Sequence, residues 1–491
     1  MPDEPLNLIV ITSDEMRGDC PGYMGNPDCR TPNLDRFAER GVAFMRHFSV
    51  FPKCVPTRIA AMTGRYCHTD GFRTIHQHLP NDHPDVLAAL KEHGYESALF
   101  GINHCWENVY GDPLNKKGAG YTDYQSFTED YFQHMLDREW HPPEPPEGAP
   151  EPLETPEGAD FHYRGRKTEP RTGFCDDNRA EEAIHYLTEV RDRSRPFFMQ
   201  LNLSQPHPAY AVEEPYYSMY DRDAIQPWPH DLPENAPLHM RRMREVRSGE
   251  DPPEDLLREI QAVYYGMITK TDMLIGRVLD AIEGEGLLQN TVVLFFVDHG
   301  DFAGQYALPE KWDTCMADCL LHVPCILWAP GLPEGKKVED LTQHVDFPRT
   351  LLGLLGIEPD WGIHGRNLVS IMRGEERREA AFADGGHEEE MQARMPKDAR
   401  GSGKQVTYAK HPETMARAKM VRTKRWKLVT RLTGGNELYD MENDRWEMHN
   451  LWDRVEDDPE LQRVVLDLQQ KMIDWCTRTD TDRPYQEKVG A

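Results

Sequence analysis

Along its first three quarters the chain alternates short apolar segments with longer segments whose apolar residues recur at helical spacing. Residues 291–297 are almost wholly apolar, as in a strand buried on both faces. Thr31-Pro32 marks the start of a helix that Gly41 ends. This alternation predicts an α/β fold, a mostly parallel sheet between two layers of helices. The predicted strands are residues 6–12, 95–100, 196–203 and 291–297, and the predicted helices are residues 31–40, 84–93, 177–192 and 254–283.

The pattern changes beyond Met372. Residues 419–432 and 436–441 are predicted to be antiparallel strands around Gly434-Gly435, and residues 459–476 an amphipathic helix. We therefore predict a large α/β domain at residues 1–372 and a small α+β domain at residues 373–491. Residues 141–158, rich in Pro, Glu and Gly, are expected to form a surface excursion that serves as a lid or an oligomer contact.

Composition excludes several functions. Among 491 residues, 56 Lys and Arg face 84 Asp and Glu, a formal charge of −28, which argues against nucleic acid and anionic membrane as partners. The longest clean apolar run is far below the ~20 residues of a membrane-spanning helix. The acidic N-terminus is unlike a signal peptide, so we expect a cytoplasmic protein whose ten cysteines are free thiols.

Each predicted strand runs into a carboxylate, an imidazole or both. The residues concerned are Asp14 and Glu15, His104, His207, and Asp298 and His299. Ligands of open parallel sheets bind where the carboxyl ends of the strands meet. Crowded carboxylates favour a divalent cation, and oxygen ligands favour Ca²⁺ or Mg²⁺, while the histidine leaves Mn²⁺ as an alternative. On residue types alone, a turn capped by Asp298 has equal weight.

A second feature is Cys54-Val55-Pro56-Thr57-Arg58, followed by Thr63-Gly64-Arg65. A lone cysteine is commonly a small buried hydrophobe. Here Arg58 follows by four positions, near a predicted helix N-terminus where anions are favoured. The spacing is too short for the Cys-x5-Arg loop of thiol phosphatases.

Cys54-x-Pro-x-Arg58 with Thr63-Gly64-Arg65 resembles the sulfatase signature. The resemblance extends over nearly the whole chain, through Thr31-Pro32-Asn33-Leu34-Asp35, Asp298-His299-Gly300-Asp301, Lys311-Trp312, Val323-Pro324, Ala329-Pro330-Gly331, Met420–Leu428 and Glu437-Leu438-Tyr439-Asp440. It implies an alkaline-phosphatase-like fold and a metal-dependent sulfuric ester hydrolase. It also implies that a maturation enzyme converts Cys54 to formylglycine.

The resemblance also implies roles for the matching residues. Asp14, Glu15, Cys54, Asp298 and His299 would surround one divalent ion, with Ca²⁺ favoured over Mn²⁺ and Mg²⁺. Arg58 would hold the formylglycine, and His104 would take a proton from it. His104, His207 and Lys311 would contact the ester's oxyanion and leaving oxygen, and His207, with Lys311, would protonate the leaving oxygen.

Three departures from the family pattern keep alternatives open. Glu15 stands where many sulfatases have Asp, and His299 where many have Asn, which leaves the identity of the metal open. The segment Gly101-Ile102-Asn103-His104 keeps the family's histidine but lacks its lysine. Phosphonate monoester hydrolases also lack that lysine but do not keep the histidine. A phosphonate monoester or phosphodiester hydrolase is therefore the nearest alternative.

A non-catalytic protein of the same fold that binds metal and anions is the alternative from another class, and the complete set of site residues speaks against it. The expected substrate is a small-molecule or saccharide sulfate ester, and a homo-oligomer is compatible with the sequence. His68, Arg73, His76 and His78 form a basic stretch after the cysteine motif. An anion pocket and an exposed polar loop are both open for this stretch.

Overall fold

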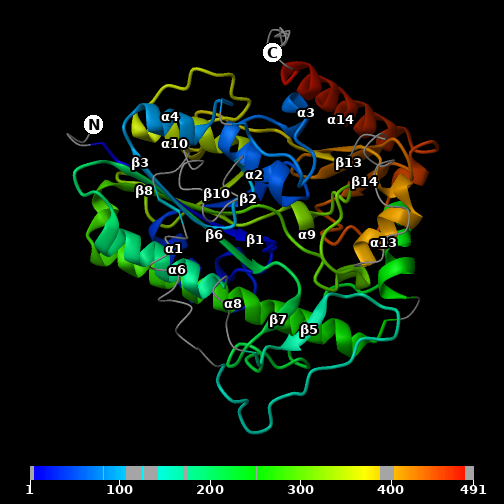
Figure 1. Cartoon of the computed structure of the whole chain (residues 1–491). Helices are drawn as coiled ribbons and strands as arrows, with labels where there is room; N and C mark the ends of the chain where they lie inside the picture. The colour runs from blue at the N-terminus through cyan, green and yellow to red at the C-terminus, as the bar shows by residue number, and fades with distance from the viewer. Residues whose placement is uncertain are drawn as a thin grey trace, which may run out of the picture.

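The structure, a computed structural model, describes residues 5–80, 82–106, 142–169, 175–249, 252–386 and 403–480, together with the backbone of 124 and 125. Within these residues, one eight-stranded sheet forms the centre of the molecule (Figure 1). All its neighbouring strands are parallel except β9, which is antiparallel to both β2 and β8. In sheet order the strands are β10 (Lys336–Gln343), β2 (Val42–Phe48), β9 (Cys325–Trp328), β8 (Thr291–Val297), β1 (Asn7–Asp14), β6 (Phe197–Pro206), β3 (Glu96–Gly101) and β4 (Tyr124–Gln125).

Two layers of helices cover the sheet, one on each face (Figure 1). Successive residues of β1 point to opposite faces, so Ile9 and Ile11 pack in the core under α1, α6 and α8, while Leu8 and Val10 pack under α2, α4 and α10. Burial on both faces explains why β1 and β8 are nearly continuous apolar runs. The first layer is α1 (Pro32–Arg40), α6 (Asp176–His185) and α8 (Glu254–Gly284); the second is α2 (Cys54–Thr63), α4 (Val86–Glu92), α10 (Phe347–Leu355) and α11 (Leu368–Arg373). The predicted α/β class is confirmed.

A second, four-stranded antiparallel sheet lies in the C-terminal part of the chain. Its order is β11 (Ala381–Gly385), β12 (Ala418–Arg422), β13 (Trp426–Arg431) and β14 (Glu437–Asp440). The helix α14 (Pro459–Arg478) covers it with Leu461, Val465, Leu468 and Trp475. The amphipathic helix predicted there is confirmed.

The single strand predicted at residues 419–432 is wrong, because the chain reverses within it. The backbone N–H of Thr423 donates to the carbonyl of Trp426 at 2.8 Å, and the Thr423 hydroxyl accepts from the Trp426 N–H at 2.9 Å. This turn contains neither Gly nor Pro, so the sequence pattern does not mark it. The sheet agrees with the predicted α+β character of residues 373–491, and their status as a separate domain stays a prediction.

The remaining described elements are short. Residues 142–158 contain no helix or strand and are largely exposed, and residue 141 lies outside the described residues; their role as a lid or oligomer contact stays a prediction. In the part of the chain that the structure describes, every helix is too short or too polar to cross a bilayer.

The short elements are α3 (Cys67–Asp70), β5 (Tyr163–Arg166), β7 (Tyr210–Val212), α7 (Leu238–Met243), α9 (Asp318–Leu321) and α13 (Gly403–Lys410).

Candidate active site

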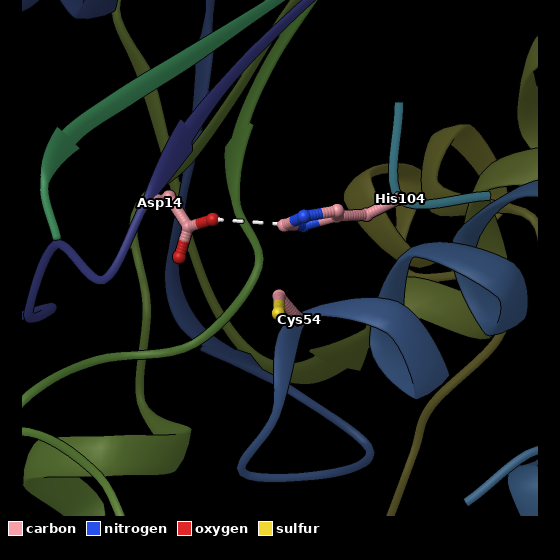
Figure 2. Close-up of side chains that lie close together, drawn as sticks. All are labelled: Asp14, Cys54 and His104. Carbon is pink, nitrogen blue, oxygen red and sulfur yellow. Dashed lines mark ion pairs between the residues drawn. The ribbon is translucent and has the colours of Figure 1, made fainter. Parts of the chain in front are cut away.

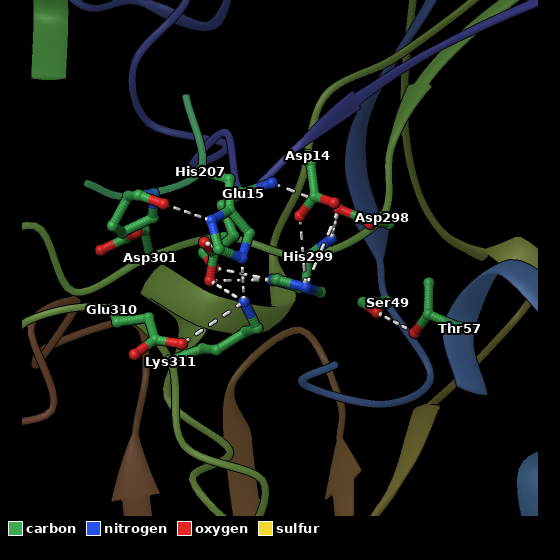
Figure 3. Close-up of polar contacts among 12 residues, drawn as sticks. Asp14, Glu15, Ser49, Thr57, His207, Asp298, His299, Asp301, Glu310 and Lys311 are labelled. Carbon is green, nitrogen blue, oxygen red and sulfur yellow. Dashed lines mark hydrogen bonds and ion pairs between the residues drawn. The ribbon is translucent and has the colours of Figure 1, made fainter. Parts of the chain in front are cut away.

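The predicted strand-end residues meet at one edge of the central sheet. Asp14 is the last residue of β1, and Glu15 follows it with a left-handed backbone (φ 68°) that ends the strand. Strand β1 lies between β6, which leads to His207, and β8, which leads to Asp298 and His299. Figure 3 shows these side chains pointing toward one another. The convergence predicted from parallel strand ends is therefore present.

His299 is the residue whose surroundings most clearly fit a cation. Its Nδ1 lies 3.0 Å from the carbonyl of Gly300, which can only accept, so the proton of the neutral ring is on Nδ1. The bare Nε2 then lies 3.8 Å from Asp14 Oδ1 and 3.9 Å from Asp298 Oδ1. Burial lowers the pKa of His299 to about 3, which keeps the ring neutral. A lone pair facing two carboxylate oxygens is repulsive unless a cation lies between them.

The carboxylates of this cluster are buried without enough partners. Burial and the nearby Asp298 raise the pKa of Asp14 to about 7, and burial raises that of Glu15 to about 7 against the opposing charge of Lys311. Asp14 Oδ1, Glu15 Oε2 and His299 Nε2 have no hydrogen-bond partner among the described residues. Three carboxylates and one neutral imidazole suit a hard divalent cation, so the residues present fit such an ion.

Arg58 approaches the same carboxylates from α2. Its Nε donates to Asp298 Oδ2 at 2.8 Å and its Nη2 to Asp14 Oδ2 at 3.1 Å. Burial alone would raise the pKa of Asp298, but the Arg58 charge and His299 hold it below its usual value. Arg58 Nη1 has no acceptor among the described residues, so one donor remains for a further anion.

Cys54 begins α2 and faces the cluster. Figure 2 shows its sulfur beside the pair Asp14 and His104, and one ligand atom of each of these three residues lies within 4.8 Å of the others. All ten residues of α2 are buried, and Cys54 is 5% exposed. Burial and the charge of Asp14 raise the pKa of the Cys54 thiol to about 12. An unmodified Cys54 is therefore a protonated thiol at neutral pH and a poor nucleophile.

The loop before Cys54 is held by hydroxyl groups and one ion pair. The hydroxyl oxygens of Ser49 and Thr57 lie 2.8 Å apart, and each lies 2.8 Å from the carbonyl oxygen of Phe51, so one hydroxyl donates to the other and the second donates to that carbonyl. Lys53, which precedes Cys54, forms a buried ion pair with Asp313. These contacts fix the first turn of α2, and nothing in the residue pattern around Cys54 indicates them.

His104, His207 and Lys311 surround the space above the carboxylates. Lys311 Nζ lies 2.5 Å from Glu15 Oε1 and 3.1 Å from His207 Nε2. The side chain of His207 is 37% exposed and that of His104 is 26% exposed, so both reach toward solvent, whereas that of Lys311 is 4% exposed. His104 Nδ1 lies 3.9 Å from Asp14 Oδ2. Burial and the Lys311 charge lower the pKa of His207.

The structure brings together all nine residues predicted for the site. It also adds residues to which sequence analysis gave no role. Asp301 accepts from the Tyr210 hydroxyl at 2.6 Å, and that hydroxyl accepts from the Glu310 N–H at 2.8 Å. The carboxylate of Glu310 lies 3.7 Å from Lys311 Nζ (Figure 3). The sequence offered two signals for these residues: Asp301 stands in the motif Asp298-His299-Gly300-Asp301, and Glu310 precedes Lys311.

Comparison with known proteins finds a family model and relatives that match this chain. The sulfatase family model matches residues 6–357. The chain is 27% identical over 381 residues to an ulvan-active sulfatase of Formosa agariphila, covering 76% of this chain and 66% of that protein. It is 26% identical over 405 residues to an arylsulfatase of Clostridium perfringens, covering 77% of this chain and 80% of that protein.

A solved structure shows the same architecture. The phosphonate monoester hydrolase of Agrobacterium radiobacter superposes with a TM-score of 0.73 at 24% identity, covering 97% of this chain and 96% of that one. The fold is therefore alkaline-phosphatase-like, with a large, mostly parallel sheet between helices. The chain belongs to the sulfatase family, as its resemblance predicts.

Proposed function

We propose that this protein hydrolyses sulfate esters with one divalent cation and a formylglycine derived from Cys54. The position of Cys54 carries the proposal. It stands in the family's signature at the first turn of α2, beside Asp14 and His104, in a form that is not itself nucleophilic. A maturation enzyme that converts it is part of the proposal.

The cation would be held by Asp14, Glu15, Asp298 and His299, with residue 54 completing the site. It would neutralise an anionic ester and activate a nucleophile, and the hydrated aldehyde at residue 54 would offer two hydroxyls on one carbon, one to attack and one to expel sulfate. Ca²⁺ is favoured by the three carboxylates, with Mn²⁺ and Mg²⁺ as alternatives.

The side chains around residue 54 supply the charges and the protons. Arg58 and Lys311 are buried cations that would stabilise the anion. His104 would accept a proton from residue 54, near which it lies. The partly exposed His207 accepts a hydrogen bond from Lys311 at Nε2 (3.1 Å), so His207 together with Lys311 would supply a proton to the leaving oxygen.

One observation supports phosphonate monoester or phosphodiester hydrolysis as a second candidate. The family's lysine precedes its histidine by two positions, and the uncharged Ile102 stands at that position here, two residues before His104. The site therefore has one cation fewer than many sulfatases.

A substrate screen tests both candidates. Purified enzyme loaded with Ca²⁺, Mn²⁺ or Mg²⁺ is assayed on matched aryl sulfate, aryl phosphonate and phosphodiester substrates. The proposal expects the highest kcat/KM on the sulfate ester. A higher kcat/KM on the phosphonate with no turnover of sulfate would establish the alternative. A cytoplasmic location and a homo-oligomeric state stay predictions.

A further inference from the structure

A cavity lies away from the strand ends, between α3 and α14. We call it the α3–α14 pocket. Its volume is about 660 Å³, and its charged lining residues are His68, Arg73, Asp384, Arg417, Lys419 and Asp480. Figure 1 shows α3 beside α14, and the rings of His68 and Trp475 lie 4.8 Å apart. Neither His76 nor His78 lines this cavity, so the basic stretch of the sequence is divided between a pocket and a surface loop.

The lining carries more positive than negative charge. Asp384 is buried, and its carboxylate lies 2.6 Å from Lys419 Nζ, 2.7 Å from His68 Nδ1 and 3.5 Å from Arg73 Nη2. With Arg417 and Asp480, the pocket has three permanent cations and two carboxylates, apart from His68. A local excess of positive charge is opposite in sign to the net charge of the chain, which is −28.

Arg73 supplies an unused donor in this wall. Arg73 is 7% exposed, and its Nη1 has no hydrogen-bond acceptor among the described residues. A buried guanidinium with an unsatisfied N–H is costly. An ion pair that merely ties two elements together needs neither this surplus donor nor a cavity of about 660 Å³ beside it. An oxyanion is the ligand that guanidinium and ammonium groups bind most strongly.

The pocket wall is continuous with the segment that carries Cys54. The backbone N–H of Asp384 donates to the carbonyl of Val50 at 2.9 Å, four residues before Cys54. On the other side, the thiol of Cys67, in α3, donates to the carbonyl of Pro56 at 3.4 Å. Asp384 of the pocket lining thus contacts the segment before Cys54, and α3, which carries the lining residue His68, contacts α2 two residues after Cys54.

We propose that the α3–α14 pocket binds a compact oxyanion, and that this oxyanion is a second sulfate or carboxylate group of a polyanionic substrate. The inference rests on the proposed function and deepens it, because it assigns the substrate to molecules with more than one anionic group. Inorganic sulfate shares the same chemistry, so the test separates the free ion from a group carried by the substrate.

Binding is measured first, without turnover. A Cys54→Ala protein is titrated calorimetrically with a disulfated disaccharide, its monosulfated counterpart and inorganic sulfate. Arg417→Glu reverses an exposed charge of the pocket, and Arg463→Glu makes the same change on an exposed part of α14 outside it. We expect Arg417→Glu to weaken binding of the disulfated disaccharide about tenfold or more and to leave the monosulfated one unchanged. Arg463→Glu should leave both unchanged.

Turnover is measured next in proteins that retain Cys54. Arg417→Glu should lower kcat/KM about tenfold on the disulfated disaccharide alone. Arg73→Met should do the same, and its melting temperature shows whether the buried change unfolds the protein. Equal losses on both disaccharides, or no loss on either, would overturn the inference. So would inorganic sulfate that binds in dependence on Arg417 while the substrates are unaffected. If the wild type hydrolyses no sulfate ester, the proposed function fails, and the titrations still decide whether the pocket takes the second group.

Discussion

The Cys54 side chain lies in surroundings that suppress ordinary thiol chemistry. Its pKa of about 12 follows from burial and from the neighbouring Asp14. We expect mass spectrometry of the peptide around residue 54 from active enzyme to show an aldehyde in place of the thiol. Cys54→Ala should abolish turnover while the melting temperature stays close to that of the wild type. Active enzyme whose peptide carries only the unmodified thiol would contradict the proposal.

Asp298 is the carboxylate with the most contacts in the cluster. It accepts from Arg58 at 2.8 Å and from the backbone N–H of Glu15 at 3.2 Å, and its other close neighbour is His299. Asp298→Asn keeps the shape but removes one negative charge, so we expect bound metal and activity to be lost together. Elemental analysis after dialysis measures the metal. Asp280→Asn, on the exposed surface of α8, is the control and should keep both. Full metal occupancy in Asp298→Asn would show that Asp298 is not a ligand.

His207 is expected to matter most for poor leaving groups. A nitrophenolate leaves well without a proton, whereas an alkyl or sugar oxygen does not, and a general acid typically contributes 10²–10⁴-fold. His207→Ala should therefore reduce kcat/KM on alkyl sulfates more than on activated aryl sulfates, by about 3–5 kcal/mol. The measurement is kcat/KM against leaving-group pKa for both proteins. An equal loss on all substrates would assign proton donation to Lys311, which lies 3.1 Å from His207.

At the scale of elements, a close backbone approach holds the loop after β8. A Cβ on Gly300 would lie 2.0 Å from the carbonyl oxygen of Cys319, in α9, and the Gly300 N–H donates to the Leu320 carbonyl at 2.7 Å. Gly300→Ala should destabilise the protein by about 1–3 kcal/mol and weaken metal binding, because the loop carries His299.

Gly284 provides the matched control for this prediction. It lies in α8, where an added Cβ meets nothing within 4 Å, so Gly284→Ala should stabilise the protein by about 0.5–1 kcal/mol. Denaturant titrations with and without metal measure both variants. Unchanged stability and metal affinity in Gly300→Ala would show that the loop moves freely away from α9.

Strand ends were the part of the site that the sequence could predict. Asp14 ends β1 and Asp298 follows β8, and because both strands are buried on both faces of a mostly parallel sheet, their ends come together. Strand β11 could not be predicted in this way, because its residues are Ala, Phe, Ala, Asp and Gly. The ion pair of Lys53 with Asp313 could not be predicted either, since it joins residues 260 positions apart that share no periodic pattern.

At the scale of the whole molecule, Asp384 ties the C-terminal sheet to the segment after α2. Burial alone would raise the pKa of the Asp384 carboxyl. The hydrogen bond from His68 and the charge of Lys419 lower this pKa by more than burial raises it, so it lies below its usual value. A carboxylate with a depressed native pKa stabilises the fold above its unfolded pKa of about 3.9, and this contribution is lost as the pH falls through the native pKa.

Asp384→Asn should therefore cost about 3–5 kcal/mol at pH 7, because it leaves buried cations unpaired. The difference from wild type should shrink as the pH falls below about 4. Urea unfolding at pH 7, 5 and 3.5 measures it. Asp467→Asn, on the exposed face of α14, should change stability by less than about 0.5 kcal/mol. A difference that stays constant down to pH 3.5 would show that ionisation of Asp384 is not its cause.

The complete burial of α2 also sets an order of events during synthesis. In the folded protein Cys54 is 5% exposed, so another enzyme cannot bind the chain around it. Residues 291–297, whose strand leads to Asp298 beside α2, leave the ribosome more than two hundred residues later, on the order of 10–50 s at about 5–20 residues per second. The proposed conversion of Cys54 thus has a time window that opens when its segment emerges and closes when β8 joins the sheet. Slower translation of the middle of the chain would widen that window, and the fraction of converted protein would rise.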